Sequence, residues 1–160
     1  MTTEDARVLG PGLAPTPFTA AEIRAGCRPG RTITTHVEGD GGISVRTTTY
    51  LSADAEGGEF ESRVLGSDGT VVETGVGRAS WIELQSHAAF PADRTTIEER
   101  RLELPTGSAD CLLYTVRDGD VVRRFWFDTT RPGMPVRVES EVAGVVTSVS
   151  TVVADKRLDA

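Results

Sequence analysis

Apolar and polar residues alternate along most of the chain from residue 31 onward. Ile33, Thr35 and Val37, for example, fall on one side of an extended segment, because successive side chains of a strand point to opposite faces. Turns that contain Gly or Pro separate the alternating segments and favour short connections. The pattern predicts eight or nine antiparallel strands, in the ranges 31–38, 43–51, 60–64, 71–72, 95–104, 110–117, 121–128, 136–142 and 145–154.

Two short segments break the alternation and predict helices. Thr19 precedes Glu22 by three residues, the spacing of a capping box at a helix N-terminus, and this predicts a first helix of about two turns. Ser80 and Glu83 repeat the spacing and predict a second helix of two to three turns that ends before Pro91.

The number of strands determines the shape of the predicted sheet. A meander of this length accumulates twist, and a sheet that closes or wraps protects its exposed edges. The helix that begins at Trp81 lies in mid-chain, between the two halves of the sheet. We therefore predict a mainly β (α+β) fold, in which a strongly curved antiparallel meander closes into a barrel or half barrel, with two short helices, one covering or plugging the concave face.

One β-rich domain is predicted over residues 17–157. A chain of 160 residues has the length of an ordinary single domain and is long enough to bury a core. Residues 1–16 are rich in Gly, Pro and Ala and show no periodicity, which predicts a disordered N-terminal leader.

The chain is acidic, with a formal net charge of -7, and this argues against nucleic acid as a partner. No apolar run has the length of a signal peptide or a membrane span, so a cytoplasmic location without membrane contact is expected. Lys156 is the only lysine, and this preference for arginine is typical of bacteria with GC-rich genomes.

Metal and cofactor chemistry finds no support in the sequence. Cys27 and Cys111 are far apart and form no CxxC motif, so both are expected to be reduced thiols. His36 and His87 have no neighbour at metal-ligand spacing, and no glycine-rich loop opens a helix. We therefore expect no metal and no cofactor.

His87 and Glu99 are the candidate catalytic residues. His87 lies late on the second predicted helix, where it is placed to act as a general base or simply to complement the terminal helix carbonyls. Glu99 belongs to a run of charged residues, 98–101, on a predicted strand. Such a run forms a solvated ladder unless one face is buried, and burial would raise the pKa of the carboxyl group.

Candidate ligand-binding residues are aromatic or cationic. Trp81, Tyr114 and Trp126 offer flat apolar surfaces, although aromatic residues at strand spacing also serve as core packing. Arg124 shares a face of its predicted strand with Trp126 and completes the set.

The stretch from Gly107 to Gly144, under a quarter of the chain, resembles a known group of proteins. Its pattern consists of Gly107, Cys111, Tyr114, Phe125-Trp126-Phe127, Pro132-Gly133, Pro135-Val136, Glu139 and Gly144. This order is similar to the closing hairpins of periplasmic lipoprotein carriers and related half-barrel domains. The resemblance implies an unclosed, strongly bent sheet around a helix, with an apolar hollow for acyl groups. The chain departs from that family in showing no export signal.

Three functions follow from this interpretation. The first is the binding of one small, mostly apolar organic molecule inside the curved sheet. The second is a cofactor-free cyclase, isomerase or hydrolase that acts on such a molecule in specialised metabolism. The third is a structural or protein-binding subunit that uses an exposed sheet edge. The sequence leaves a homodimer open.

Overall fold

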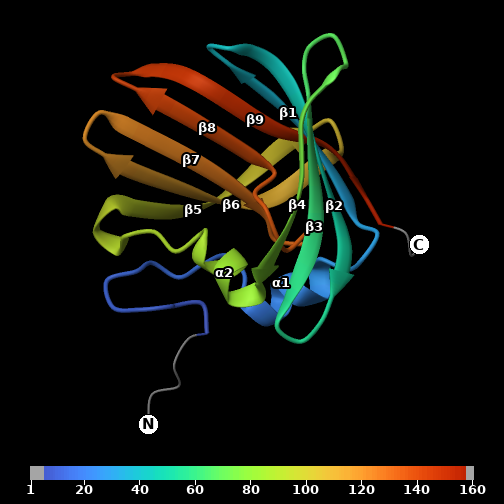
Figure 1. Ribbon diagram of the computed structural model, residues 1–160. Helices are drawn as coiled ribbons and strands as arrows, with labels where there is room; N and C mark the ends of the chain where they lie inside the picture. The colour runs from blue at the N-terminus through green and yellow to red at the C-terminus, as the bar shows by residue number, and fades with distance from the viewer. Residues whose placement is uncertain (1–5, 158–160) are drawn as a thin grey trace.

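A computed structural model describes residues 6–157 and contains one antiparallel sheet of nine strands and two short α-helices (Figure 1). The strands are β1 (Thr32–Gly39), β2 (Gly42–Ala53), β3 (Gly57–Leu65), β4 (Val71–Ser80), β5 (Thr95–Leu104), β6 (Gly107–Asp118), β7 (Val121–Asp128), β8 (Arg137–Val142) and β9 (Val145–Lys156). The helices are α1 (Ala20–Gly26) and α2 (Trp81–Ser86), and a 3-10 turn covers Ala92–Arg94. The predicted antiparallel meander and its two short helices are confirmed.

The strands follow the order β4-β3-β2-β1-β9-β8-β7-β6-β5 across the sheet. Two meanders, β1 to β4 and β5 to β9, meet where β1 pairs with β9. The edge strands β4 and β5 do not pair with each other, so closure into a barrel, one of the two predicted forms, is wrong. The reason lies in their connection, which folds into α2 and the 3-10 turn instead of a hairpin and leaves β4 and β5 at opposite edges.

One face of the sheet is covered at one end by both helices (Figure 1). Phe60 of β3 and Phe125 of β7 line the same cavity as Ile23 of α1 and Leu84 of α2. Strands β3 and β7 are separated by four others in the sheet, so these side chains can line one cavity only because the sheet is bent. Helical cover of the concave face, expected from one helix, is provided by α1 and α2 together.

Capping boxes begin both helices, as the sequence predicts. The Thr19 hydroxyl accepts a hydrogen bond from the Glu22 N–H at 3.1 Å, and the Glu22 carboxylate accepts one from the Thr19 N–H at 3.0 Å. Ser80 and Glu83 repeat this exchange, with both distances at 3.1 Å. Helix α2 is shorter than expected because the three residues after Ser86 form tighter i to i−3 bonds instead of continuing the α-helix.

The N-terminal segment is packed against the fold over residues 6–16, the stretch for which the sequence predicts a disordered leader. The Ala14 N–H donates to the Phe90 carbonyl at 2.8 Å, and the Tyr114 hydroxyl donates to the Pro15 carbonyl at 2.6 Å. These long-range bonds supply an ordering energy that local composition does not reveal. The first five residues lie outside the described part of the chain.

A buried ion pair joins the start of β1 to the end of β9. Arg31 and Asp155 have side chains only 2% and 4% exposed, and the guanidinium donates to both carboxylate oxygens, at 3.0 and 2.7 Å. Arg31 also donates to the carbonyls of Gly26 and Pro132, at 3.1 and 2.7 Å. Burial opposes the Asp155 charge, but the hydrogen bonds and charge of Arg31 outweigh it and lower the pKa of the carboxyl group. One side chain thus connects α1, β1, β9 and the β7–β8 connection.

Replacing Asp155 with Asn should lower the free energy of unfolding by about 3 kcal/mol, because the buried Arg31 charge loses its counter-ion. In the wild type, the pKa of Asp155 is lower in the folded protein than in the unfolded chain. The charged carboxylate therefore stabilises the fold fully at pH values above the pKa of the unfolded chain. This stabilisation is lost as the pH falls through the pKa of the folded protein. Urea unfolding at a series of pH values measures both effects.

Glu141→Gln is the matched control for this prediction. Glu141 pairs with Arg124 at 3.4 Å, but the two side chains are 21% and 26% exposed. Such a pair contributes about 0–1 kcal/mol, so this variant should unfold close to the wild type. Equal losses of unfolding free energy in the two variants would show that the buried pair contributes no more to stability than the exposed one.

Candidate functional site

A cavity of about 500 Å³ lies between the concave face of the sheet and the two helices. Strands from both meanders contribute to its wall, and α1, α2 and the β7–β8 connection complete it. The lining residues are Ile23, Thr35, Val37, Arg46, Thr48, Tyr50, Phe60, Ser62, Leu84, His87, Ala88, Phe125, Phe127, Gly133, Met134, Pro135, Val138 and Ser150. We call this cavity the interior pocket.

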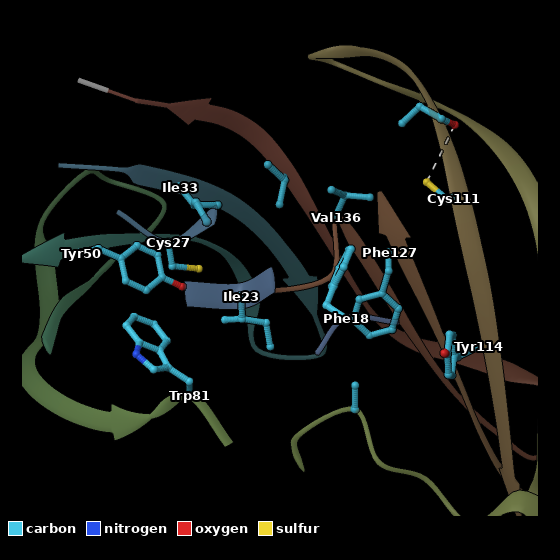
Figure 2. Packing of buried hydrophobic residues seen from close by; sticks show 13 residues of the cluster. Phe18, Ile23, Cys27, Ile33, Tyr50, Trp81, Cys111, Tyr114, Phe127 and Val136 are labelled. Atoms are coloured by element: carbon cyan, nitrogen blue, oxygen red, sulfur yellow. Dashed lines mark hydrogen bonds between the residues drawn. The ribbon is translucent and has the colours of Figure 1, made fainter. Parts of the chain in front are cut away.

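Aromatic packing builds the β7 side of the interior pocket. Phe125 and Phe127 are two residues apart on β7, and their nearly parallel rings lie 6.4 Å apart. Phe90 stacks on Phe125 at 4.8 Å, and Phe18 meets Phe127 edge to face at 6.3 Å. Figure 2 shows Phe18, Phe127 and Tyr114 side by side in this cluster. The rings are therefore held in fixed orientations by neighbours that lie outside the pocket wall.

Hydrogen bonds fix the position of α2 over the pocket. The Trp81 indole N–H donates to the Asp54 carbonyl at 2.8 Å, at the turn between β2 and β3. Gln85 is fully buried, donates to the Thr16 hydroxyl at 3.0 Å and accepts from the Ala20 N–H at 2.9 Å. These contacts attach α2 to the sheet, to α1 and to the N-terminal segment, and they orient the face of α2 that lines the pocket.

The thiol and phenol groups at the α1 end are not nucleophiles at neutral pH. Burial raises the pKa of Tyr50 far above its ordinary value, and a hydrogen bond with Cys27 adds to the effect. Burial also raises the pKa of Cys27, although Tyr50 and Arg31 lessen this shift. Figure 2 shows the Tyr50 hydroxyl turned toward the Cys27 sulfur. Both groups stay protonated and act as packing and hydrogen-bonding residues.

A second, more open groove of about 690 Å³ runs between α1, the start of α2 and the β2–β3 turn. Its wall consists largely of alanines, with Arg24, Arg28 and Ile82 among the larger side chains. It has no aromatic surface apart from the edge of Trp81. The interior pocket is therefore the better candidate for binding a small molecule.

Of the predicted catalytic pair, the structure places only His87 at the interior pocket. His87 is exposed at the C-terminus of α2, and its backbone N–H donates to the Leu84 carbonyl at 3.3 Å. Glu99 lies on the edge strand β5, is exposed to solvent and does not line the pocket. The structure therefore does not bring the two candidates together.

The predicted ligand-binding residues lie outside the interior pocket. Trp81 and Tyr114 are buried in the core, where their polar atoms bond to backbone carbonyls. Trp126 points to the opposite face of β7 from Phe125 and packs under the Arg137 guanidinium, 5.6 Å from its ring centre. Arg124 shares that outer face and pairs with Glu141.

Sequence reasoning missed most of the actual lining, including Phe125 and Phe127. The alternation in β7 separates these two residues from Trp126, and both faces of the strand are apolar in sequence, so alternation alone does not indicate which face points inward. Two aromatic residues at positions i and i+2 are a stronger signal for a buried face than one, and they mark the correct side here.

Among residues 6–157, no group of three or more His, Cys, Asp or Glu side chains is arranged to hold a metal ion. Within the same residues, no helix has the length and apolar character needed to span a bilayer.

Sequence comparison assigns no family to the chain. No family model matches it, and no curated protein matches it in sequence.

Comparison of folds does find similar solved structures. An exported protein with a YmcC-like fold from Bacteroides fragilis matches with a TM-score of 0.51 and 11% identity, over 81% of this chain and 97% of the other. MucB in the Pseudomonas aeruginosa MucA/MucB complex matches with a TM-score of 0.60 and 14% identity, over 84% of this chain and 54% of the other. MucB bound to MucA(peri) gives a TM-score of 0.61 and 14% identity, over 86% of this chain and 52% of MucB.

These likenesses establish the class of fold. The chain is similar to MucB and to the YmcC-like protein, which supports the resemblance to lipoprotein-carrier domains at the level of architecture. The chain spans about half the length of MucB. The predicted cytoplasmic location is wrong, because one neighbour is an exported protein and MucB forms its complex with MucA(peri).

Replacing Gly58 with Ala should destabilise the protein by about 1–3 kcal/mol, because the added methyl group would lie 2.9 Å from the Trp81 ring and 3.3 Å from the Ser52 carbonyl. Gly75→Ala is the control, since a methyl group there meets no atom within 4 Å. Thermal unfolding followed by circular dichroism measures the difference. An unchanged midpoint for Gly58→Ala would contradict a fixed contact between Trp81 and the sheet.

Proposed function

We propose that this protein binds a mostly apolar small organic molecule in the interior pocket. The observation that carries the proposal is the combination of a cavity of about 500 Å³ with a wall of ordered phenylalanine, methionine and aliphatic side chains. Small-molecule pockets commonly measure about 300–1,000 Å³ and are mainly apolar, with few polar groups. Burial of an apolar ligand against this wall supplies the driving force for binding.

The fold comparisons favour a protein partner as an alternative to a small molecule. MucB, to which the chain is similar, forms a complex with another protein, MucA. A protein partner is therefore the second candidate. Valines at positions 71, 72 and 76 on the open edge strand β4 are exposed and would suit strand addition by an extended segment.

Catalysis is supported less well than binding. His87 lines the pocket, but its side chain makes no hydrogen bond with any described residue, and Glu99 lies elsewhere. A general base is normally oriented by a further group. If His87 is catalytic, His87→Gln should abolish turnover of a bound compound and leave its affinity unchanged.

The neutral fluorophore N-phenyl-1-naphthylamine tests the binding proposal, because its emission rises in an apolar environment. We expect saturable binding to the wild type. Ser150→Phe should weaken binding about tenfold or more, since Ser150 lies on the floor of the pocket between Val37 and Val138 and a phenyl ring would fill that space.

Thr151→Phe is the matched control, because Thr151 is the next residue of β9 and points to the opposite face of the sheet. Its affinity for the fluorophore should equal that of the wild type. Circular dichroism establishes that both variants are folded. Absence of saturable binding, or equal losses in the two variants, would rule out the interior pocket as the binding site.

A further inference from the structure

We infer that the interior pocket selects an amphiphile with an anionic head group, a carboxylate or a phosphate, and that Arg46 binds this head group. The inference rests on the proposed function and specifies the ligand class. The polar lining of the pocket is concentrated on one side. Strands β1 to β3 carry a guanidinium and several hydroxyl groups beside Val37, Tyr50 and Phe60, whereas the lining of β7, β8 and the helices is apolar.

Arg46 is a cation without a counter-ion among residues 6–157. It lies on β2, directly opposite Thr35 of β1 and Val64 of β3, so neither flanking strand places a carboxylate beside it. It makes no hydrogen bond or ion pair with any residue in the described part of the chain. In the same sheet, Arg63 and Arg137 contact the carboxylates two residues away on their own strands, at 3.1 and 2.7 Å.

The unpaired state of Arg46 is not due to a shortage of acidic residues. The chain has 24 Asp and Glu residues against 17 Lys and Arg, and its net charge of -7 repels anions in general. An anionic ligand therefore needs a local positive group at its site. Arg46 is such a group, and it faces the pocket from the concave side of the sheet.

Hydroxyl groups surround Arg46 on the same wall. Thr35 is its direct partner across the β1–β2 pair, Thr48 is two residues further along β2, and Ser62 lies opposite Thr48 on β3. All three line the pocket, and their side chains make no hydrogen bond with the described residues. A guanidinium with several free hydroxyl donors provides hydrogen bonds for the oxygens of a carboxylate or phosphate.

The opposite wall explains why the ligand is an amphiphile and not a free anion. Phe125, Phe127 and Met134 offer no hydrogen-bond donor to an anion, and they lie on the side of the pocket formed by β7 and the β7–β8 connection. An apolar tail on these side chains would bury hydrophobic surface while its head group reaches Arg46. The tail would also displace water and so strengthen the charge interaction.

Competition against N-phenyl-1-naphthylamine tests this inference with four probes of equal chain length: decanoate, decyl phosphate, neutral decanol and decyltrimethylammonium. The wild type should bind the two anions more tightly than decanol, and the cation most weakly. Arg46→Gln should weaken binding of the anions about 10- to 100-fold, because the anions lose a charged hydrogen-bond partner. The affinity for decanol should change by less than about twofold, because decanol carries no charge.

Two further variants sharpen the result. Arg123→Gln is the matched control, since Arg123 is exposed on the sheet, has no ion pair with the described residues and does not line the pocket; its affinities should equal those of the wild type. Arg46→Lys keeps the positive charge but cannot form the bidentate hydrogen bonds of a guanidinium, so this variant should retain an intermediate preference for anions.

The outcomes separate this inference from the proposed function. The head-group assignment is wrong, and the binding function stands, if the fluorophore binds but Arg46→Gln leaves the preference for anions unchanged. The same conclusion follows if this variant weakens the binding of decanol as much as the binding of the anions. Displacement by inorganic phosphate at the concentrations effective for decyl phosphate would also overturn it, since it would indicate a site for the free anion. If no probe and no fluorophore binds, the proposed function itself fails.

Discussion

The ion pair between Arg31 and Asp155 is the constraint on which the arrangement of the two meanders depends. It lies where β1 meets β9, the one place where the first half of the sheet pairs with the second. Burial makes each charge costly by itself, so the two residues are stable only together, and the remaining donors of Arg31 reach α1 and the β7–β8 connection. The relative placement of four elements thus depends on this buried pair, to which Arg131 adds a second contact with Asp155 at 3.2 Å.

The interior pocket is a consequence of that junction. Arg46 and most of the hydroxyl groups of its wall belong to the first meander, whereas Phe125 and Phe127 belong to the second, so neither half contains the complete wall. Trp81 and Gln85 then hold α2 over the space between the walls. Buried polar groups therefore hold the architecture together, whereas exposed or half-buried groups such as Arg46 remain available to a ligand.

The sequence predicts features that depend on neighbouring residues. The capping box of Thr19 and Glu22 and the alternation of β7 needed only local spacing, and both the helix and the strand are present. The inward face of a strand depends on its partners, which is why alternation alone indicates Trp126 as readily as Phe125. Contacts across long stretches of sequence, such as the bond from Ala14 to Phe90, leave no local pattern. The fold was therefore largely predictable, but the pocket lining was not.

The open edges of the sheet also affect the size of the pocket. In a closed barrel, the number and tilt of the strands fix the interior diameter. Here β4 and β5 end the sheet on either side, so its curvature can relax or tighten while every ladder hydrogen bond is kept. Strand closure therefore sets no fixed diameter for the interior pocket, and the cover formed by α1 and α2 bounds it on the side that faces the sheet.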